Sequence, residues 1–176
     1  CYDEMPFYEL IDHLKEEHHF VSQELSFNEK HTKEIIFKTE EIFETMCLDF
    51  ASTLFEVDGK TFMISIREKD IFNQNQTTFI QWIHFLGTPK EAKNYAYTLE
   101  YYCKDGRTST YTGQAIPVND QFENYKDVSD GFTCFMIDFE KFKTQFIDGN
   151  RFEYSIRFKN LKEEIKDENA NPESEK

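Results

Sequence analysis

The sequence predicts a mostly β protein, an eight-stranded antiparallel β-sandwich with two short helices. Three observations lead to this fold class. Apolar and polar side chains alternate with a period of two residues through 32–160, as they do in half-buried strands. Turn signals of the Asp-Gly type separate the alternating runs, and helical periodicity is confined to short segments. The chain has 176 residues, which is enough to bury one core of this kind.

The strand assignments follow from the alternation. Phe152, Tyr154, Ile156 and Phe158 share one face of a run whose other face is polar, and this is the clearest half-buried strand of the chain. The run at 79–86 is apolar at nearly every position, as in a strand that is covered on both faces. Strands are expected at 33–38, 47–56, 62–66, 79–86, 95–101, 107–116, 132–137 and 152–158.

Turn and helix signals lie between these strands. Asp-Gly pairs at 58–59 and 105–106 predict hairpin turns. The sequence Thr-Pro-Lys-Glu at 88–91 is a capping box with proline at the first helical position, which predicts a helix of one or two turns. Phenylalanines spaced i, i+3, i+7 within 139–146 predict a second short helix, which the Asp-Gly-Asn sequence at 148–150 ends.

The charge of the chain excludes two classes of partner. There are 20 Lys+Arg against 34 Asp+Glu, so the formal net charge is −14. Nucleic-acid binding needs a clustered basic surface, and an anionic membrane repels an acidic one, so we expect neither partner. No apolar run approaches the length of a transmembrane helix.

The cysteines indicate a reducing compartment. Cys1, Cys47, Cys103 and Cys134 are few and widely spaced, unlike the framework of a disulfide-rich secreted domain. We therefore expect reduced thiols and a cytoplasmic or nuclear location. Because the chain opens with Cys1 rather than Met, we also expect it to be a fragment of a longer protein.

Catalytic motifs are absent from the sequence. It contains no phosphate-binding loop ending in GK[ST], no Gly-x-Ser-x-Gly and no His-Glu-x-x-His. His84, Cys103 and Cys134 fall in apolar strand patterns, where such residues usually pack in the core. We expect no catalytic residue in this chain.

One spacing near the start of the chain is typical of a metal site. Cys1, His13 and His18 have the spacing of the second half of a Cys₂His₂ zinc finger, with the histidines at the end of an amphipathic helix. His19 is an alternative to His18 as a ligand. The other interpretation is an ordinary acidic helix with surface histidines. The residues alone leave both open.

A longer motif lies in the middle of the chain. Residues 85–100 read FLGTPKEAKNYAYTLE, which meets every fixed position of (I/L)-G-T-x-K-x-A-x-N-(F/Y)-A-Y-x-L-E. This motif resembles the central signature of the seven-in-absentia family of RING-type E3 ubiquitin ligases. The resemblance covers residues 1–159, and the spacing of Cys1, His13 and His18 is similar to the second zinc finger of that family.

The resemblance implies a fold and a function. In the family, a RING recruits the E2 enzyme, zinc fingers follow, and a TRAF-like β-sandwich binds substrates and forms a homodimer. It implies these units here: the end of a Zn²⁺-binding finger (1–20), a linker (21–31), the substrate-binding sandwich (32–160) and an acidic, disordered tail (161–176). No RING residues are present, so ligase activity would belong to an upstream part.

The resemblance also implies a peptide-binding groove. In the family, an extended degron of the type Pro-x-Ala-x-Val-x-Pro adds as a strand to a sheet edge. This chain has Phe where the family has Trp and Ser where it has Met, which predicts a shallower groove or another motif. The implied groove residues are Glu34, Ile36, Leu48, Asp49, Phe50 and Ser52.

Two other functions remain as alternatives. The first is a non-catalytic adaptor or scaffold that has the same sandwich and no functional RING. The second, more remote, is a ligand-binding sandwich unrelated to ubiquitin, which would need an exposed aromatic platform or an acidic metal cluster. We locate neither feature in the sequence.

Overall fold

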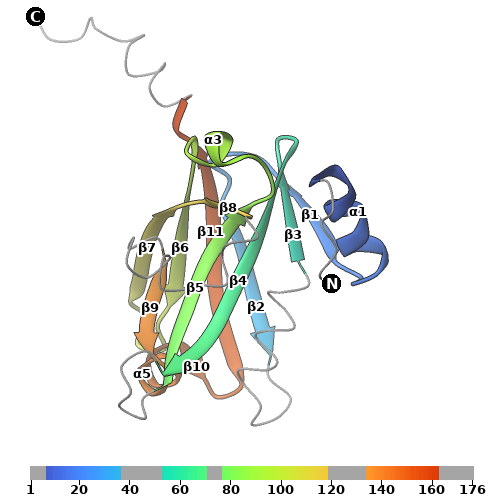
Figure 1. Cartoon of the computed structure of the whole chain (residues 1–176). Helices are drawn as coiled ribbons and strands as arrows, with labels where there is room; N and C mark the ends of the chain where they lie inside the picture. Colours follow the sequence, from blue (N-terminus) through green and yellow to red (C-terminus); the bar gives the residue numbers. More distant parts are fainter. Residues whose placement is uncertain (1–6, 37–52, 71–76, 119–133, 163–176) are drawn as a thin grey trace, which may run out of the picture.

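The computed structural model describes residues 7–36, 53–70, 77–118 and 134–162. These residues form two β-sheets with short helices at the margins, so the predicted β-sandwich is confirmed (Figure 1). Helix α1 lies beside β1, whereas α3 and α5 lie at opposite ends of the sheets. The described helices are α1 (Phe7–Glu16), α3 (Pro89–Ala92) and α5 (Phe139–Phe146).

The first sheet has the strand order β1-β3-β4-β5-β8, and β9 also pairs with β5. Its β3–β4 hairpin turns at Asp58 and Gly59, which have φ angles of 47° and 74°. Both central residues of a type I′ hairpin need positive φ, so the predicted Asp-Gly turn is confirmed. The strands are β1 (Val21–Leu25), β3 (Thr53–Val57), β4 (Lys60–Asp70), β5 (Thr77–Phe85), β8 (Ile116–Pro117) and β9 (Phe135–Asp138).

The second sheet has the order β10-β11-β6-β7, and β2 also pairs with β11. The β6–β7 pair is antiparallel and turns at the predicted Asp105-Gly106 signal, where Gly106 has φ 83°. The residue ranges are β10 (Ile147–Asp148), β11 (Arg151–Asn160), β6 (Tyr95–Tyr102), β7 (Thr108–Gln114) and β2 (His31–Ile36).

The core between the sheets is aromatic. Phe62 of β4 packs against Phe158 of β11 with 4.6 Å between ring centroids, and Phe79 of β5 stacks on Phe142 of α5 at 4.3 Å. All four rings are at most 1% exposed. Burying a side chain of this size contributes about 1.5–3 kcal/mol, so these contacts hold the two sheets and α5 together.

Both predicted short helices have the caps that their sequences indicated. Thr88 and Glu91 form the reciprocal capping box of α3, in which Thr88 Oγ1 accepts a hydrogen bond from the backbone of Glu91. Asp138 caps α5 by accepting from the backbone N–H of Lys141 at 2.9 Å. Such caps satisfy backbone donors that a helix start leaves unpaired.

The segment 21–31, expected as a linker, instead contains a strand. β1 pairs in parallel with β3, from Val21 opposite Thr53 to Leu25 opposite Val57. The sequence of β1, VSQEL, has only two apolar residues, and none of its five residues is buried. Sheet pairing rather than burial of an apolar face therefore holds this strand, and periodicity did not predict it.

Some predictions fall outside the described residues. They include Cys1, residues 37–38 of the strand expected at 33–38, the first part of the strand expected at 47–56, through residue 52, residues 132–133 of the strand expected at 132–137, and the acidic tail from 163 onward.

A candidate peptide-binding edge

Strand β2 lies at one edge of the second sheet. It pairs with β11 along one side, from His31 opposite Ile156 to Ile36 opposite Arg151. Within the part of the chain that the structure describes, no strand pairs with its other side. An unpaired strand edge presents backbone N–H and C=O groups that another extended chain can bind.

The end of this edge is apolar and exposed. Ile36, the last residue of β2, is 55% exposed, whereas Ile35 beside it is buried. An isoleucine in this position leaves apolar area in water that an added side chain would cover. Of the groove residues expected from the sequence, Ile36 and Glu34 lie on this edge, and both are exposed.

Glu34 is already engaged on the sheet. Its carboxylate forms an ion pair with the guanidinium of Arg151 and accepts a hydrogen bond from Arg151 Nε. Arg151 stands opposite Ile36 in the β2–β11 register, so the ion pair is diagonal. The pair fixes the outward face of β2 beside Ile36, and sequence reasoning did not single out Arg151 because the two residues are 117 positions apart.

The other end of β2 is anchored in the core. The His31 ring packs edge-on against Phe55 of β3 at 6.3 Å. Burial, and secondarily the charge of Lys33, lowers the pKa of His31 below its usual value of 6.5. The residue before the strand, Lys30, pairs with Glu100 and lies 5.3 Å from the centroid of the Tyr102 ring. β2 is therefore fixed at its start, and no strand of the described ranges pairs along its outer edge.

The facing edge of the first sheet is covered by the chain itself. β1 occupies the side of β3 that would otherwise be free over residues 53–57. The strand that could take a guest peptide is thus β2 and not this part of β3. Leu48, Asp49, Phe50 and Ser52, which the resemblance placed in the groove, lie outside the described residues.

The histidines of the expected zinc site come together. His13 lies in the last turn of α1 and His18 just after it, with ring centroids 5.0 Å apart. His13 Nε2 is buried, and within the described residues it has no hydrogen-bond partner. A buried imidazole nitrogen with no donor or acceptor beside a second imidazole fits a metal ligand pair.

The rest of that zinc site is not described. Cys1 lies outside the described residues, and the described ones contain no group of three or more potential ligands. Helix α1, which carries His13, is tied to the sandwich, because Lys15 Nζ lies 2.6 Å from Glu56 Oε1 of β3. This ion pair, like the pairing of β1, joins the first segment of the chain to the first sheet.

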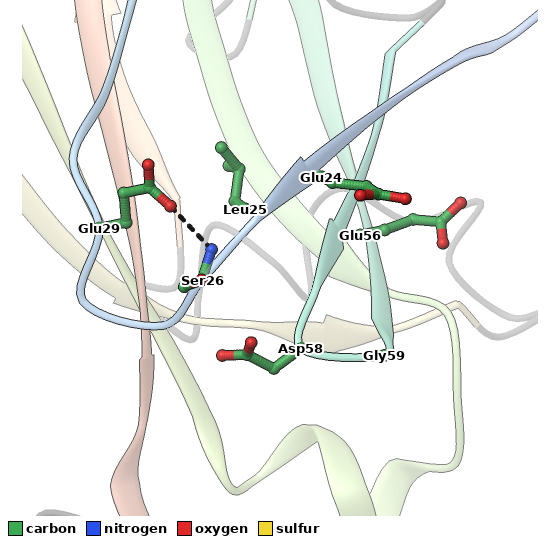
Figure 2. A pocket seen from close by; sticks show the side chains of 7 residues that line it. All are labelled: Glu24, Leu25, Ser26, Glu29, Glu56, Asp58 and Gly59. Atoms are coloured by element: carbon green, nitrogen blue, oxygen red, sulfur yellow. Dashed lines mark hydrogen bonds between the residues drawn. The ribbon is translucent and has the colours of Figure 1, made fainter.

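An acidic hollow of about 530 Å³ lies where β1 meets the β3–β4 hairpin (Figure 2). Two of its carboxylates bind the backbone of the turn after β1: Asp58 accepts from the Phe27 N–H at 2.8 Å, and Glu29 accepts from the Ser26 N–H at 3.0 Å. Glu24 and Glu56 stand opposite each other in the β1–β3 register. Because these acids shape the turn after β1, we assign the hollow a structural role.

The two described cysteines, Cys103 and Cys134, both have thiols whose pKa is raised. Burial raises the pKa of the Cys134 thiol to about 11 and raises that of Cys103. Thiols protonated at neutral pH are poor nucleophiles.

No helix in the described part of the chain is long and apolar enough to cross a membrane.

Comparison with known proteins identifies the fold family. No curated protein matches the chain. Residues 55–157, from β3 into β11, match the family described as Sina, TRAF-like domain. This match covers more than half of the chain and includes the signature at 85–100, which forms the end of β5, helix α3 and most of β6. The chain therefore belongs to the seven-in-absentia family and carries its TRAF-like substrate-binding domain.

Proposed function

We propose that this chain is the substrate-recognition and dimerisation domain of a seven-in-absentia-type E3 ubiquitin ligase. It binds an extended peptide of the substrate as an added strand, and the bound substrate is ubiquitinated and degraded by the proteasome. The observation that carries the proposal is the outer edge of β2, against which the described residues place no strand and which ends in the exposed Ile36.

The geometry supports strand addition rather than binding in a deep pocket. Main-chain hydrogen bonds to the edge of β2 supply affinity for any extended segment, and the side chains that alternate along it supply selectivity. Ile36 offers apolar contact, and the Glu34–Arg151 pair offers a polar one. The partners are therefore substrate proteins with extended segments.

The catalytic step belongs to other parts of the machinery. An E2 enzyme that is recruited by a RING would supply the activated ubiquitin, and this domain would hold the substrate near it. The alternative is a non-catalytic adaptor that uses the same edge without a RING. Both functions need the β2 edge, so they differ in the companion domain and not in the site.

We also propose that His13 and His18 bind Zn²⁺ together with Cys1. Zinc would fix α1 as a folded unit, because a structural site contributes folding energy to the segment that closes around it. Lys15 then holds this unit against β3. We propose that the protein is located in the cytoplasm or the nucleus, where thiols stay reduced.

The peptide proposal is tested by titration. A fluorescently labelled peptide with the Pro-x-Ala-x-Val-x-Pro motif, and peptides selected from a random library on this chain, are titrated against the chain and Ile36→Asp. The variant places a charge at an exposed site, so the fold is kept while affinity falls at least about tenfold. Met136→Asp is the matched control, because Met136 is also exposed, at 37%, but lies on β9.

The outcome is decisive in either direction. Loss of binding in Ile36→Asp with unchanged binding in Met136→Asp supports the β2 edge. Equal affinity of the wild-type chain and Ile36→Asp for every selected peptide would show that the peptide binds elsewhere.

A further inference from the structure

A hollow of about 280 Å³ lies on the second sheet beside the β2 edge. Residues of β2, β6, β10 and β11 line it, together with the end of α5 and the turn between β6 and β7. The end of β2 lies at the same end of the molecule as β10 and α5 (Figure 1). Glu34 and Arg151 belong both to the hollow and to the candidate edge, so the hollow continues the surface proposed for the substrate peptide.

The hollow combines an apolar lining with exposed carboxylates. Phe146, which is 2% exposed, lines it together with the half-buried Tyr102 and Cys103. A lining of this kind suits a long side chain that has an apolar stem and a cationic head, because the stem packs on the apolar part while the head stays near the carboxylates. The carboxylates belong to three exposed residues: Glu34, Asp148 and Glu153.

The positive charges around the hollow leave two of these carboxylates without a partner. Two cations line the hollow, Arg151 and Lys104. The guanidinium of Arg151 is taken up by Glu34. Among the described residues, no ion pair joins Lys104, Asp148 or Glu153 to any other side chain. A cation from a partner would therefore find two carboxylates that no ion pair of the described residues neutralises.

The position of Glu153 runs against the usual rules for a sheet. In the β2–β11 register it stands directly opposite Glu34, and like charges in this position destabilise a strand pair. Its neighbours Phe152 and Tyr154 are 0% exposed, so strand alternation fixes Glu153 on the outward face. Local arrangements that cost stability are expected at functional sites. A bound cation would relieve the repulsion between the two carboxylates.

A peptide on the β2 edge can reach the hollow. A strand added to β2 lies about 4.8 Å from it, and every second side chain of that strand points to the same face of the sheet as Glu34. Lysine and arginine side chains are long enough to cross one strand spacing. Their stems would pass over β2, and their heads would enter the hollow from the side of Glu34.

We infer that the hollow binds a lysine or arginine side chain of the substrate peptide. The cationic head pairs with Glu153 and Asp148, and the stem packs on Phe146 and Tyr102. The inference rests on the proposed function and names the chemistry of the substrate, which is an extended segment with a basic residue at an outward-facing position. Because the carboxylates that receive the head are exposed, the pair should contribute modestly to affinity and weaken as salt is added.

Pairs of labelled peptides that differ in one charge test the inference. The Pro-x-Ala-x-Val-x-Pro peptide and the library-selected peptides are made with lysine at each variable position in turn, and with norleucine at the same position. Norleucine has an unbranched apolar stem and no charge. At one position, or at positions two residues apart, lysine should raise affinity about threefold to fivefold over norleucine. Glu153→Gln should abolish this gain and leave the affinity for the norleucine peptides unchanged.

A matched variant separates the hollow from the overall charge. Glu9→Gln changes the net charge of the chain by the same amount as Glu153→Gln, but Glu9 is an exposed residue of α1, which lies beside β1 of the first sheet. It should keep the full lysine gain. Circular dichroism confirms that both variants are folded.

Three results would overturn the inference. The first is equal affinity for the lysine and norleucine peptides at every position. The second is a lysine gain that survives in Glu153→Gln. The third is a gain that falls equally in Glu153→Gln and Glu9→Gln, because the acidic chain then attracts basic peptides only at long range. In each case the norleucine peptides still bind and still depend on Ile36, so the proposed function stands. If no peptide of either series binds, the proposed function and this inference are both overturned.

Discussion

Removing the buried hydrogen bond between Tyr101 and Gln81 tests how much this polar contact contributes to the stability of the core. Tyr101 Oη donates to Gln81 Oε1, and both residues are 0% exposed. Burial raises the pKa of Tyr101 well above its usual value of 10, so the hydroxyl keeps its proton at all ordinary pH values. Gln81 Nε2 has no partner among the described residues. The pair is thus a polar contact inside an aromatic core.

Tyr101→Phe removes the donor and leaves the Gln81 carbonyl oxygen buried and unpaired. An unsatisfied buried acceptor costs about 1–3 kcal/mol, which is more than the net value of an ordinary hydrogen bond. The double variant Tyr101→Phe/Gln81→Leu removes both polar groups together with the unpaired Nε2. We expect its free energy of unfolding to lie within about 1 kcal/mol of the wild type.

Urea denaturation of the wild type, both single variants and the double variant measures the coupling. Tyr102→Phe is the control, because Tyr102 is only half-buried and water can replace its bond to Ser155. A loss below about 0.5 kcal/mol in Tyr101→Phe, or single losses that simply add in the double variant, would refute the reasoning.

Three further predictions follow from individual groups. Burial lowers the pKa of His31, so below pH 6.5 the unfolded chain binds more protons than the folded one. The free energy of unfolding should therefore fall as pH drops through about 6.5. In thermal melts His31→Gln should flatten this pH dependence, whereas an unchanged pH dependence would contradict the assignment. Gly113→Ala should cost about 1–3 kcal/mol in urea unfolding, because a Cβ there would lie 2.8 Å from Tyr97 Oη; an unaltered midpoint would show that Tyr97 moves freely. Iodoacetamide at pH 8 should label the half-buried Cys103 well before Cys134, because burial raises the pKa of the Cys134 thiol to about 11. Peptide mass mapping that finds the reverse order would mean that the β9 end of the sheet opens readily.

Much of the fold was predictable because its signals are local. The hairpin at Asp58-Gly59 needs two residues with positive φ, and the capping box at Thr88 needs a hydroxyl and a carboxylate three residues apart. The strand at 152–158 alternates cleanly because its inner face meets the aromatic core. In these cases the residues that determine the local structure all lie within one short segment of the sequence.

The features that escaped prediction depend on distant partners. β1 is a strand because β3 lies beside it, and nothing in VSQEL indicates that neighbour. Arg151 matters to the candidate site because the pairing of β11 with β2 places it beside Glu34, with which it forms an ion pair. Lys15 ties α1 to Glu56 in the same way. Pairings of this kind are set by the packed sheets and have no signature in any short window of sequence.

The candidate site was predictable in part. Glu34 and Ile36 were assigned to the groove through the resemblance, and both lie exposed on the edge strand β2. That they bind a peptide stays a prediction, as do the roles of Leu48, Asp49, Phe50 and Ser52 and the zinc site of Cys1, His13 and His18. The apposition of the two imidazoles agrees with the zinc assignment, but a metal assay on the chain decides it.

Hydrogen exchange of the backbone amides, with and without a bound peptide, tests the central claim most directly. If an extended peptide adds to the second sheet at β2, amides of residues 31–36 gain protection on binding, while those of 108–114 on the opposite edge keep the rates of the peptide-free chain. Protection that appears on β1 or β7, with none on β2, would contradict the account.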